Sequence, residues 1–241
     1  MGTIFEYLNR SDIPSTAITC SLWGEIVQTP RIQTALSEQF AFGPKSWIEY
    51  FGEVPEAPPL PDNIVQILKS PCLFWKEKRV HQTHLLVLIP QAVNRSPFCL
   101  NTLGELIKNP KAGHKTQYRN YSEPVQKELG EKSFSSHWVL MTRDVIPESR
   151  GKSYDDQKAL VQRHAQQSGI AYELPTALGA TTAILMEYVK TGIPLYTNDE
   201  LGKKLTYTRC QESVNNNQWP TAIGGFSSGG LGVYYDRWGG S

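Results

Sequence analysis

The chain has 241 residues, with 24 Lys and Arg against 23 Asp and Glu, so its formal net charge is +1. This balance gives no global electrostatic reason to bind nucleic acid or an anionic membrane. The longest apolar runs have five or six residues, whereas a membrane-spanning helix needs ~20, and the N-terminus lacks the features of a signal peptide. We therefore expect no membrane insertion, and a cytoplasmic protein or one exported without a conventional signal peptide.

The cysteines predict a reduced protein without a metal site. They lie far apart and include no CxxC pair: Cys20, Cys72, Cys99 and Cys210. This spacing favours free thiols in a reducing compartment, with two long-range disulfides as the alternative. His81 and His84 follow Cys72, but they stand three apart in a segment expected to be extended, so they should point to opposite faces. No second pair completes a tetrahedral set of ligands. We expect no metal and no cofactor.

The first 61 residues contain one helical pattern and one proline-rich stretch. Residues 44–51 (PKSWIEYF) predict a short helix with Pro44 in its first turn. Residues 54–61 (VPEAPPLP) can only be extended or polyproline-like, which favours a rigid connector over an SH3-type ligand. We therefore expect an N-terminal segment (1–53) packed on the body, a connector (54–61) and a main α/β domain (62–241).

The next hundred residues alternate helix and strand patterns. Residues 83–89 and 137–142 are β-rich apolar runs and predict two buried central strands. Short helices are expected at 62–68, with Asp62 as the N-cap, and at 102–107 and 122–129. A longer helix opens at Ser153, with Asp156 in the capping-box position.

Downstream of that helix we expect a short strand at 170–174 and a buried helix from Thr176 to Lys190. Beyond residue 205 the apolar period changes to two, which predicts three strands at 205–210, 219–226 and 231–235. We assign the glycines of 224–232 to turns between these strands. The expected fold class is α/β or α+β, a mixed β-sheet with packed helices and a C-terminal glycine-rich β segment.

Two basic stretches are the candidate ligand-binding surfaces. In 142–153, strand, loop, Gly-Lys-Ser and helix follow in P-loop order, but Ile146 stands where that motif needs a glycine. A capped helix after a solvated loop is the structural alternative. The stretch 108–121 has four positive charges, no acid and two tyrosines that could stack on bases, with a flexible solvated loop as its alternative. The predicted anion-binding residues are Lys111, Lys115, Arg119, Arg143, Arg150 and Lys152.

A thiol-dependent hydrolase or transferase is the alternative function. Arg209 precedes Cys210, and a neighbouring cation lowers the pKa of a thiol. Cys72 is the alternative nucleophile. His84 and His137 each stand at the start of a predicted strand, and either is a candidate base. Asp144 follows the second of these strands, where it could orient an imidazole. Packing of the cysteine in a core is the structural alternative.

Five separated segments carry a resemblance: 83–90 (THLLVLIP), 137–161, 174–189, 207–212 (YTRCQE) and 224–235 (GGFSSGGLGVYY). From about residue 40 to the C-terminus, the chain resembles an uncharacterised protein family of bacteria that live inside eukaryotic cells. The resemblance brings no activity, cofactor or catalytic residue, and it implies action in or on a host cell. The resulting hypothesis is a soluble, effector-like interaction module that binds a host protein or an anionic ligand. Nucleic acid is not an expected partner, and the oligomeric state stays open.

Overall fold

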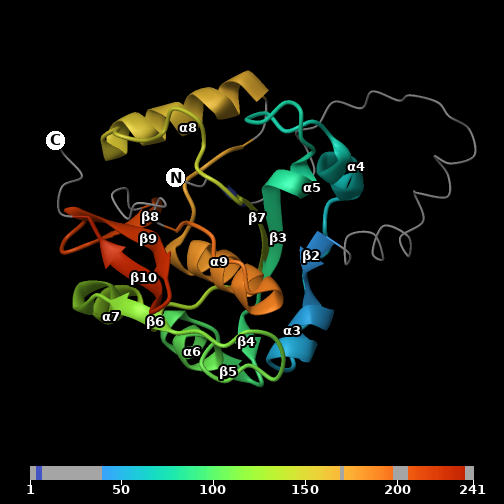
Figure 1. Cartoon of the computed structure of the whole chain (residues 1–241), viewed down its shortest axis with the longest axis vertical. Coiled ribbons are helices and arrows are strands. Elements are labelled where there is room, and N and C mark those ends of the chain that lie inside the picture. The colour runs from blue at the N-terminus through green and yellow to red at the C-terminus, as the bar shows by residue number, and fades with distance from the viewer. Residues whose placement is uncertain (1–3, 7–39, 169–170, 198–205, 237–241) are drawn as a thin grey trace, which may run out of the picture.

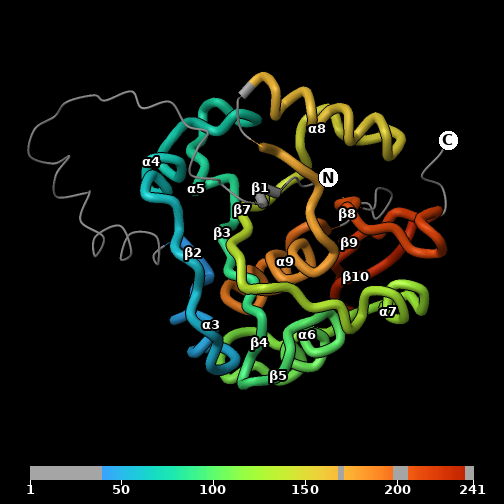
Figure 2. The backbone as a smooth tube through the Cα atoms, turned by 180° about the vertical axis from the view of Figure 1, so that it is seen from behind, coloured from blue at the N-terminus to red at the C-terminus, as the bar shows by residue number. Residues whose placement is uncertain are grey.

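The computed structural model describes residues 4–6, 40–168, 171–197 and 206–236, and the structural statements below refer to these ranges. Helix α9 (Ala177–Thr191) lies at the centre, between two four-stranded sheets (Figure 1). The view from behind shows the same arrangement of the helix and the sheets (Figure 2). The chain has a mixed α/β fold, with mixed sheets, packed helices and a C-terminal β segment rich in glycine, as the sequence predicted.

The first sheet has the order β1-β7-β3-β2 and contains both predicted central strands. Strand β3 (His84–Ile89) runs antiparallel to β7 (His137–Thr142) and parallel to β2 (Ala41–Phe42), and β1 (Ile4–Glu6) pairs antiparallel with β7. Every residue of β3 is buried. Leu86 enters one hydrophobic cluster, whereas Leu85, Val87 and Ile89 enter another, so both faces of the sheet are covered.

The second sheet has the order β6-β10-β9-β8 and provides the C-terminal β segment. The strands β8 (Tyr207–Val214), β9 (Trp219–Ser227) and β10 (Gly230–Tyr235) form an antiparallel meander, and β6 (Tyr118–Tyr121) joins β10 in parallel. Cys210, Ile223 and Val233 lie in the same core cluster as the residues of α9. Because side chains alternate along a strand, the residues beside them face away from α9.

The glycines of 224–232 do not simply form turns, and this prediction was wrong for most of them. Four of the five lie inside β9 or β10. A Cβ atom on Gly224 would lie 2.2 Å from the carbonyl oxygen of Thr206, and one on Gly232 would lie 1.8 Å from the ring of Tyr234. These glycines therefore let a neighbouring backbone and an aromatic ring lie directly on the sheet.

The two long helices begin where the sequence predicted. Helix α8 (Tyr154–Ser168) is preceded by Ser153, whose Oγ donates to Asp156 Oδ2 (2.7 Å) and accepts from the Asp156 backbone N–H (3.1 Å). Helix α9 is capped by Thr176, whose Oγ1 accepts from the Gly179 N–H at 3.0 Å. It ends at Gly192, which adopts the left-handed conformation of a helix C-cap.

The shorter elements agree with the sequence less closely. Helices α3 (Pro44–Tyr50), α6 (Leu100–Leu106) and α7 (Glu123–Leu129) occur near their predicted positions. Helix α4 (Ile64–Lys69) starts after Asn63 without a side-chain cap, so the predicted Asp62 cap was wrong. The structure adds the helix α5 (Val80–Thr83), where an extended segment was expected, and the hairpin β4 (Ala92–Val93) and β5 (Ser96–Pro97). Residues 171–174 form no strand.

Residues 40–52 are built into the core of the body. Trp47 of α3 is 0 % exposed, and its indole Nε1 donates to the backbone oxygen of Leu88 at 2.9 Å. Its ring also packs against Phe42 and Phe98 in edge-to-face geometry. Further along, Trp138 Nε1 donates to the backbone oxygen of Pro58 in the proline-rich stretch. The division into segment, connector and domain stays a prediction, and residues 1–3 and 7–39 lie outside the described residues.

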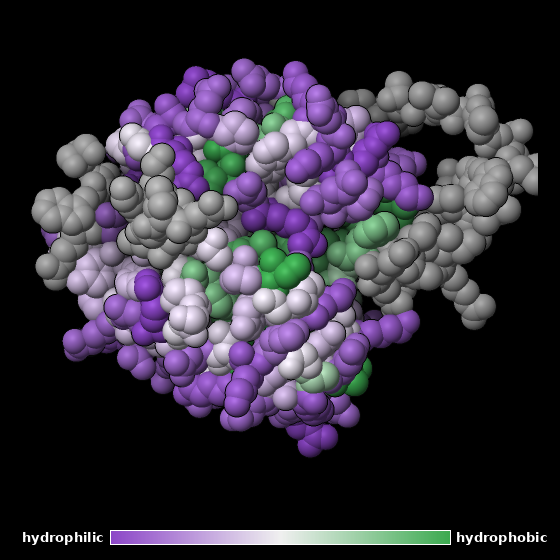
Figure 3. All heavy atoms as spheres, in the orientation of Figure 1, coloured by the Kyte–Doolittle hydropathy of each residue, from purple (hydrophilic) through white to green (hydrophobic). Residues whose placement is uncertain are grey.

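The outer surface in the view of Figure 3 is mainly hydrophilic, and hydrophobic residues gather near its middle. Among the described residues, two large hydrophobic side chains are markedly exposed, Ile48 at 54 % and Ile193 at 61 %. Polar and charged side chains thus dominate what this face offers to other molecules.

We expect the substitution Trp47→Phe to destabilise the protein by about 2–3 kcal/mol, because it removes a buried hydrogen bond and leaves space in the core. Urea unfolding of the full chain measures this change. The neighbouring substitution Ile48→Ala is the control, since it alters an exposed side chain and should change stability by less than about 0.5 kcal/mol. Equal effects of the two substitutions would contradict the role assigned to Trp47.

Candidate functional site

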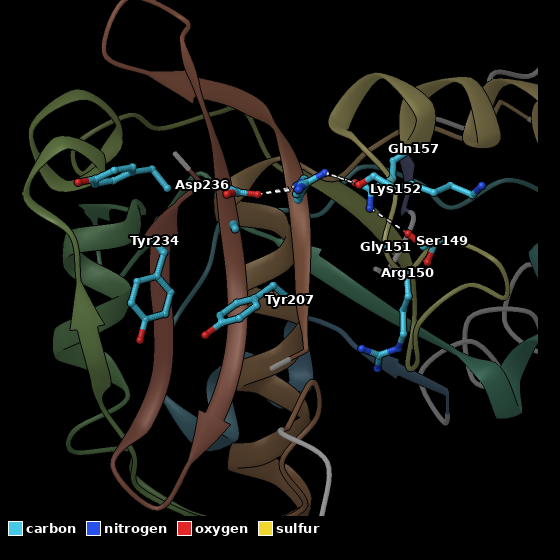
Figure 4. Close-up of a pocket in the computed structure, with 11 residues that line it drawn as sticks. Ser149, Arg150, Gly151, Lys152, Gln157, Tyr207, Tyr234 and Asp236 are labelled. Carbon is cyan, nitrogen blue, oxygen red and sulfur yellow. Dashed lines mark hydrogen bonds and ion pairs between the residues drawn. The ribbon is translucent and has the colours of Figure 1, made fainter. Parts of the chain in front are cut away.

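A cavity of about 440 Å³ lies between the segment 149–152, helix α8 and the outer face of the second sheet (Figure 4). We call it the arginine–tyrosine pocket. It is lined by Ser149, Arg150, Gly151, Lys152, Gln157, Tyr207, Arg209, Ala222, Tyr234, Tyr235 and Asp236.

Arg209 ties the walls of this pocket together. Its Nε and Nη2 both donate to Asp236 Oδ2, at 2.9 and 2.7 Å. Its Nη1 donates to Gln157 Oε1 at 2.9 Å and to the Lys152 carbonyl oxygen at 3.1 Å. Gln157 in turn donates from Nε2 to the Ser149 carbonyl oxygen at 2.9 Å. One guanidinium therefore fixes β8, α8, the segment 149–152 and the residue that follows β10.

Tyr207 and Tyr234 form the aromatic part of the pocket. They stand on β8 and β10, on either side of β9. Between them, β9 carries Ala222 and Gly224, two small residues that leave space above the middle of the sheet. Their ring centroids lie 5.7 Å apart at 85°, and Figure 4 shows both hydroxyl groups pointing the same way along the sheet. Burial raises the pKa of Tyr207, with a smaller contribution from Tyr234. The Tyr207 hydroxyl therefore stays protonated at neutral pH and can donate a hydrogen bond.

Arg119 reaches this aromatic pair because of an irregularity in β6. The pairing with β10 shifts between Leu231, which faces Tyr118, and Gly232, which faces Asn120, so Arg119 is an extra residue as in a β-bulge. The Arg119 guanidinium donates from Nη2 to the Tyr234 hydroxyl at 2.7 Å. Arg119 thereby places a positive charge at the margin of the pocket.

Arg150 supplies the other cation. Its Nη2 donates to Thr206 Oγ1 at 3.0 Å, and Figure 4 shows the guanidinium across the hollow from Tyr207. No carboxylate among the described residues pairs with Arg150 or with Arg119. Arg209, by contrast, is paired with Asp236. Lys152 extends away from the strands in Figure 4, so its backbone contributes more to the wall than its ammonium group.

The start of α8 does not provide a P-loop. Ile146, at the position of the missing glycine, is buried, and the first turn of the helix carries Asp155 and Asp156 beside the Ser153 cap. These side chains satisfy and neutralise the helix N-terminus. The segment is the capped helix after a loop that the sequence offered as the alternative.

The predicted anion-binding residues separate into two groups. Arg150 and Lys152 line the pocket, and Arg119 contacts its rim. Lys111 and Lys115 are exposed between α6 and β6 and do not line it. Arg143 forms an ion pair with Glu187 of α9, away from the other arginines.

The predicted catalytic residues are not brought together. Cys210 is 0 % exposed and faces the core around α9, whereas His84 packs its ring against Phe74 on the other face of the first sheet. His137 pairs with Ile89, at the opposite end of β3 from His84. The exposed Asp144 accepts from the Val145 N–H and not from an imidazole. The described structure therefore does not bring Cys210 together with His84, His137 or Asp144, and the thiol enzyme stays an untested alternative hypothesis.

Tyr207, Tyr234, Gln157 and Asp236 are site residues that the sequence reading missed. A signal for two residues of the pocket existed in the segment YTRCQE, because a strand over 207–210 alternates Tyr207 and Arg209 with Thr208 and Cys210. The thiol hypothesis concerned Cys210, which lies on the buried side of that strand. Gln157 and Asp236 carry no such signal, since only the folded chain brings them to Arg209.

No protein-family model matches the chain, and no curated protein and no solved structure matches it significantly. Within the described ranges, no helix combines the length and apolar character needed to cross a bilayer. No group of three or more His, Cys, Asp or Glu residues in those same ranges is arranged to hold a metal ion. The arrangement of side chains in the pocket is thus the basis for inferring function.

The described cysteines should react slowly with iodoacetamide. Cys72, Cys99 and Cys210 are all buried, so alkylation must wait for local opening and should be slower by about 100-fold or more than in the same chain unfolded in urea. Mass spectrometry resolves the rate at each site. Rapid alkylation of Cys210 at about pH 6 would contradict this expectation and support the thiol enzyme.

His84 should make the folded state sensitive to acid. Burial is the main cause that lowers its pKa from 6.5 to about 4, with a smaller contribution from the charge of Arg143 and an opposing one from a hydrogen bond with the backbone of Val80. Since the unfolded state binds the proton more readily, stability is complete above pH 6.5 and falls as the pH drops, by about 3 kcal/mol at pH 4. Urea unfolding between pH 7 and about pH 4 should show this loss reduced in His84→Gln. The same substitution at the exposed His114 is the control, and an unchanged profile in His84→Gln would contradict the assignment.

Proposed function

We propose that this protein is an interaction module that binds an anionic ligand, such as one bearing a phosphate group, in the arginine–tyrosine pocket. The observation that carries the proposal is the position of Arg150 and Arg119 beside Tyr207 and Tyr234, with no carboxylate partner for either arginine among the described residues. Guanidinium groups suit phosphates and carboxylates because their planar N–H donors match two anionic oxygens.

The pocket also has the rigidity that a binding site requires. Arg209 is paired with Asp236 and bonded to Gln157, so it serves as scaffold and leaves Arg150 and Arg119 for a ligand. A framework fixed before binding reduces the entropy lost when a ligand is held. The protonated Tyr207 hydroxyl adds a neutral donor, and the tyrosine rings add surface for an apolar part of the ligand.

The proposal refines the interaction-module hypothesis in one respect. It replaces two basic loops by one pocket, to which the stretch 108–121 contributes Arg119 but neither Lys111 nor Lys115. An effector-like role toward a host-cell molecule remains part of the proposal, and it rests on the resemblance described above.

Titration calorimetry of the full chain with pyrophosphate tests the proposal. We expect Arg150→Ala to weaken binding by about tenfold or more, as for the loss of a charge-assisted hydrogen bond. Lys115→Ala removes the same charge from an exposed loop and should leave the affinity nearly unchanged. Equal losses in the two variants would indicate only a net-charge effect and would refute the pocket. Absence of pyrophosphate binding to the unmodified chain at low salt would refute the proposal as well.

A further inference from the structure

A second cavity, of about 510 Å³, lies at the β6 edge of the second sheet, beside α6 and α7. It is independent of the arginine–tyrosine pocket, and no lining residue is shared between the two. We call it the amide pocket, because Asn101, Gln117 and Gln126 all line it.

The amide pocket carries no net charge. Glu105 and Lys108 line it, and they form an ion pair at 2.7 Å within α6 and the residues that follow it. None of its other lining residues is charged. A charged ligand would therefore gain little here, in contrast to the pocket around Arg150.

Its polar groups offer donors and acceptors close together. The Tyr121 hydroxyl donates to Asn101 Oδ1 at 3.0 Å, which leaves the Asn101 amide nitrogen as a donor. Gln126 is exposed on α7, and both ends of its amide are available to a ligand. Glu105 adds carboxylate oxygens as acceptors. Such mixed groups suit adjacent hydroxyl groups, each of which both donates and accepts.

Two tyrosine rings form an aromatic corner in the same cavity. Tyr118 and Tyr121 have ring centroids 5.1 Å apart at 67°. Their hydroxyls are directed into the protein, since Tyr118 donates to the Leu100 carbonyl oxygen at 2.9 Å and Tyr121 to Asn101. The rings therefore present apolar surface, next to the polar groups of the pocket.

The irregularity at Arg119 creates this corner. In a regular strand, residues three apart face opposite sides of the sheet. The extra residue puts Tyr118 and Tyr121 on the same side, where their rings touch, and directs Arg119 toward Tyr234. The sequence suggested that these tyrosines could stack on bases beside the basic residues of the stretch 108–121, but in the structure they do not share a face with Arg119.

A pyranose ring matches these features, because it combines an apolar C–H face with a rim of hydroxyl groups and carries no charge. We propose that the amide pocket binds a neutral saccharide, with the sugar ring against Tyr118 and Tyr121 and its hydroxyls bonded to Gln126, Asn101 and Glu105. The cavity volume lies within the range of small-molecule sites.

Saturation-transfer NMR of the full chain tests this inference with three neutral probes: maltotriose, cellotriose and triacetylchitotriose. We expect at least one to bind, with a Kd on the order of 1 mM. The substitution Gln126→Ala should weaken that binding by about fivefold or more, as for a lost hydrogen bond, and so should Glu105→Gln. Both residues are exposed, so neither change should affect folding.

Lys127→Ala is the matched control, since Lys127 is exposed on the same helix and does not line the cavity. Binding that is weakened by Gln126→Ala and unaffected by Lys127→Ala supports the inference. Binding that is indifferent to both lining substitutions would overturn it, and so would a lack of saturation transfer to all three probes at about 10 mM. Arg150→Ala separates this site from the anion site, because it should not alter saccharide binding.

Discussion

The structure depends on the burial of helix α9. Eleven of its fifteen residues are buried, so nearly the whole circumference of the helix must be covered by other parts of the chain. The first sheet covers one side and the second sheet another, and a single large cluster joins them. This requirement determines which face of each strand is interior. It also explains why residues from Phe42 to Val233 contribute to one core.

The position of the candidate anion site follows from that division of faces. In β8, burial of Thr208 and Cys210 against the core turns Tyr207 and Arg209 outward. Arg209 then meets Asp236, and their partly buried ion pair fixes the surrounding walls. A paired and hydrogen-bonded charge tolerates burial, whereas an isolated one would not. The arginines without a carboxylate partner, Arg119 and Arg150, stay at the margin, where solvent can reach them.

Local patterns in the sequence predicted those features of the fold that depend on interactions between neighbouring residues. The caps of α8 and α9, the two central strands and the period-two C-terminal strands all depend on neighbouring residues, and these were correct. The site depends on pairs far apart in the chain, such as Arg209 with Gln157 and Arg119 with Tyr234. No local pattern reveals such pairs. The prediction for Gly224, Gly225 and Gly230 was wrong for the same reason, since the atoms that crowd these glycines belong to residues of distant segments, Thr206, Tyr207 and Gln117.

The extra residue in β6 has a consequence for how this surface can change over evolution. It sets the phase of the strand, so the number of residues, and not only their identity, decides which side chain faces which pocket. Loss of Arg119 alone would make β6 regular, with Tyr118 and Tyr121 two positions apart and still on the same side of the sheet. The aromatic corner would then remain, while the guanidinium beside Tyr234 would be lost. The one extra position thus lets a single edge strand serve two pockets of opposite character, and the charged pocket can change without the neutral one.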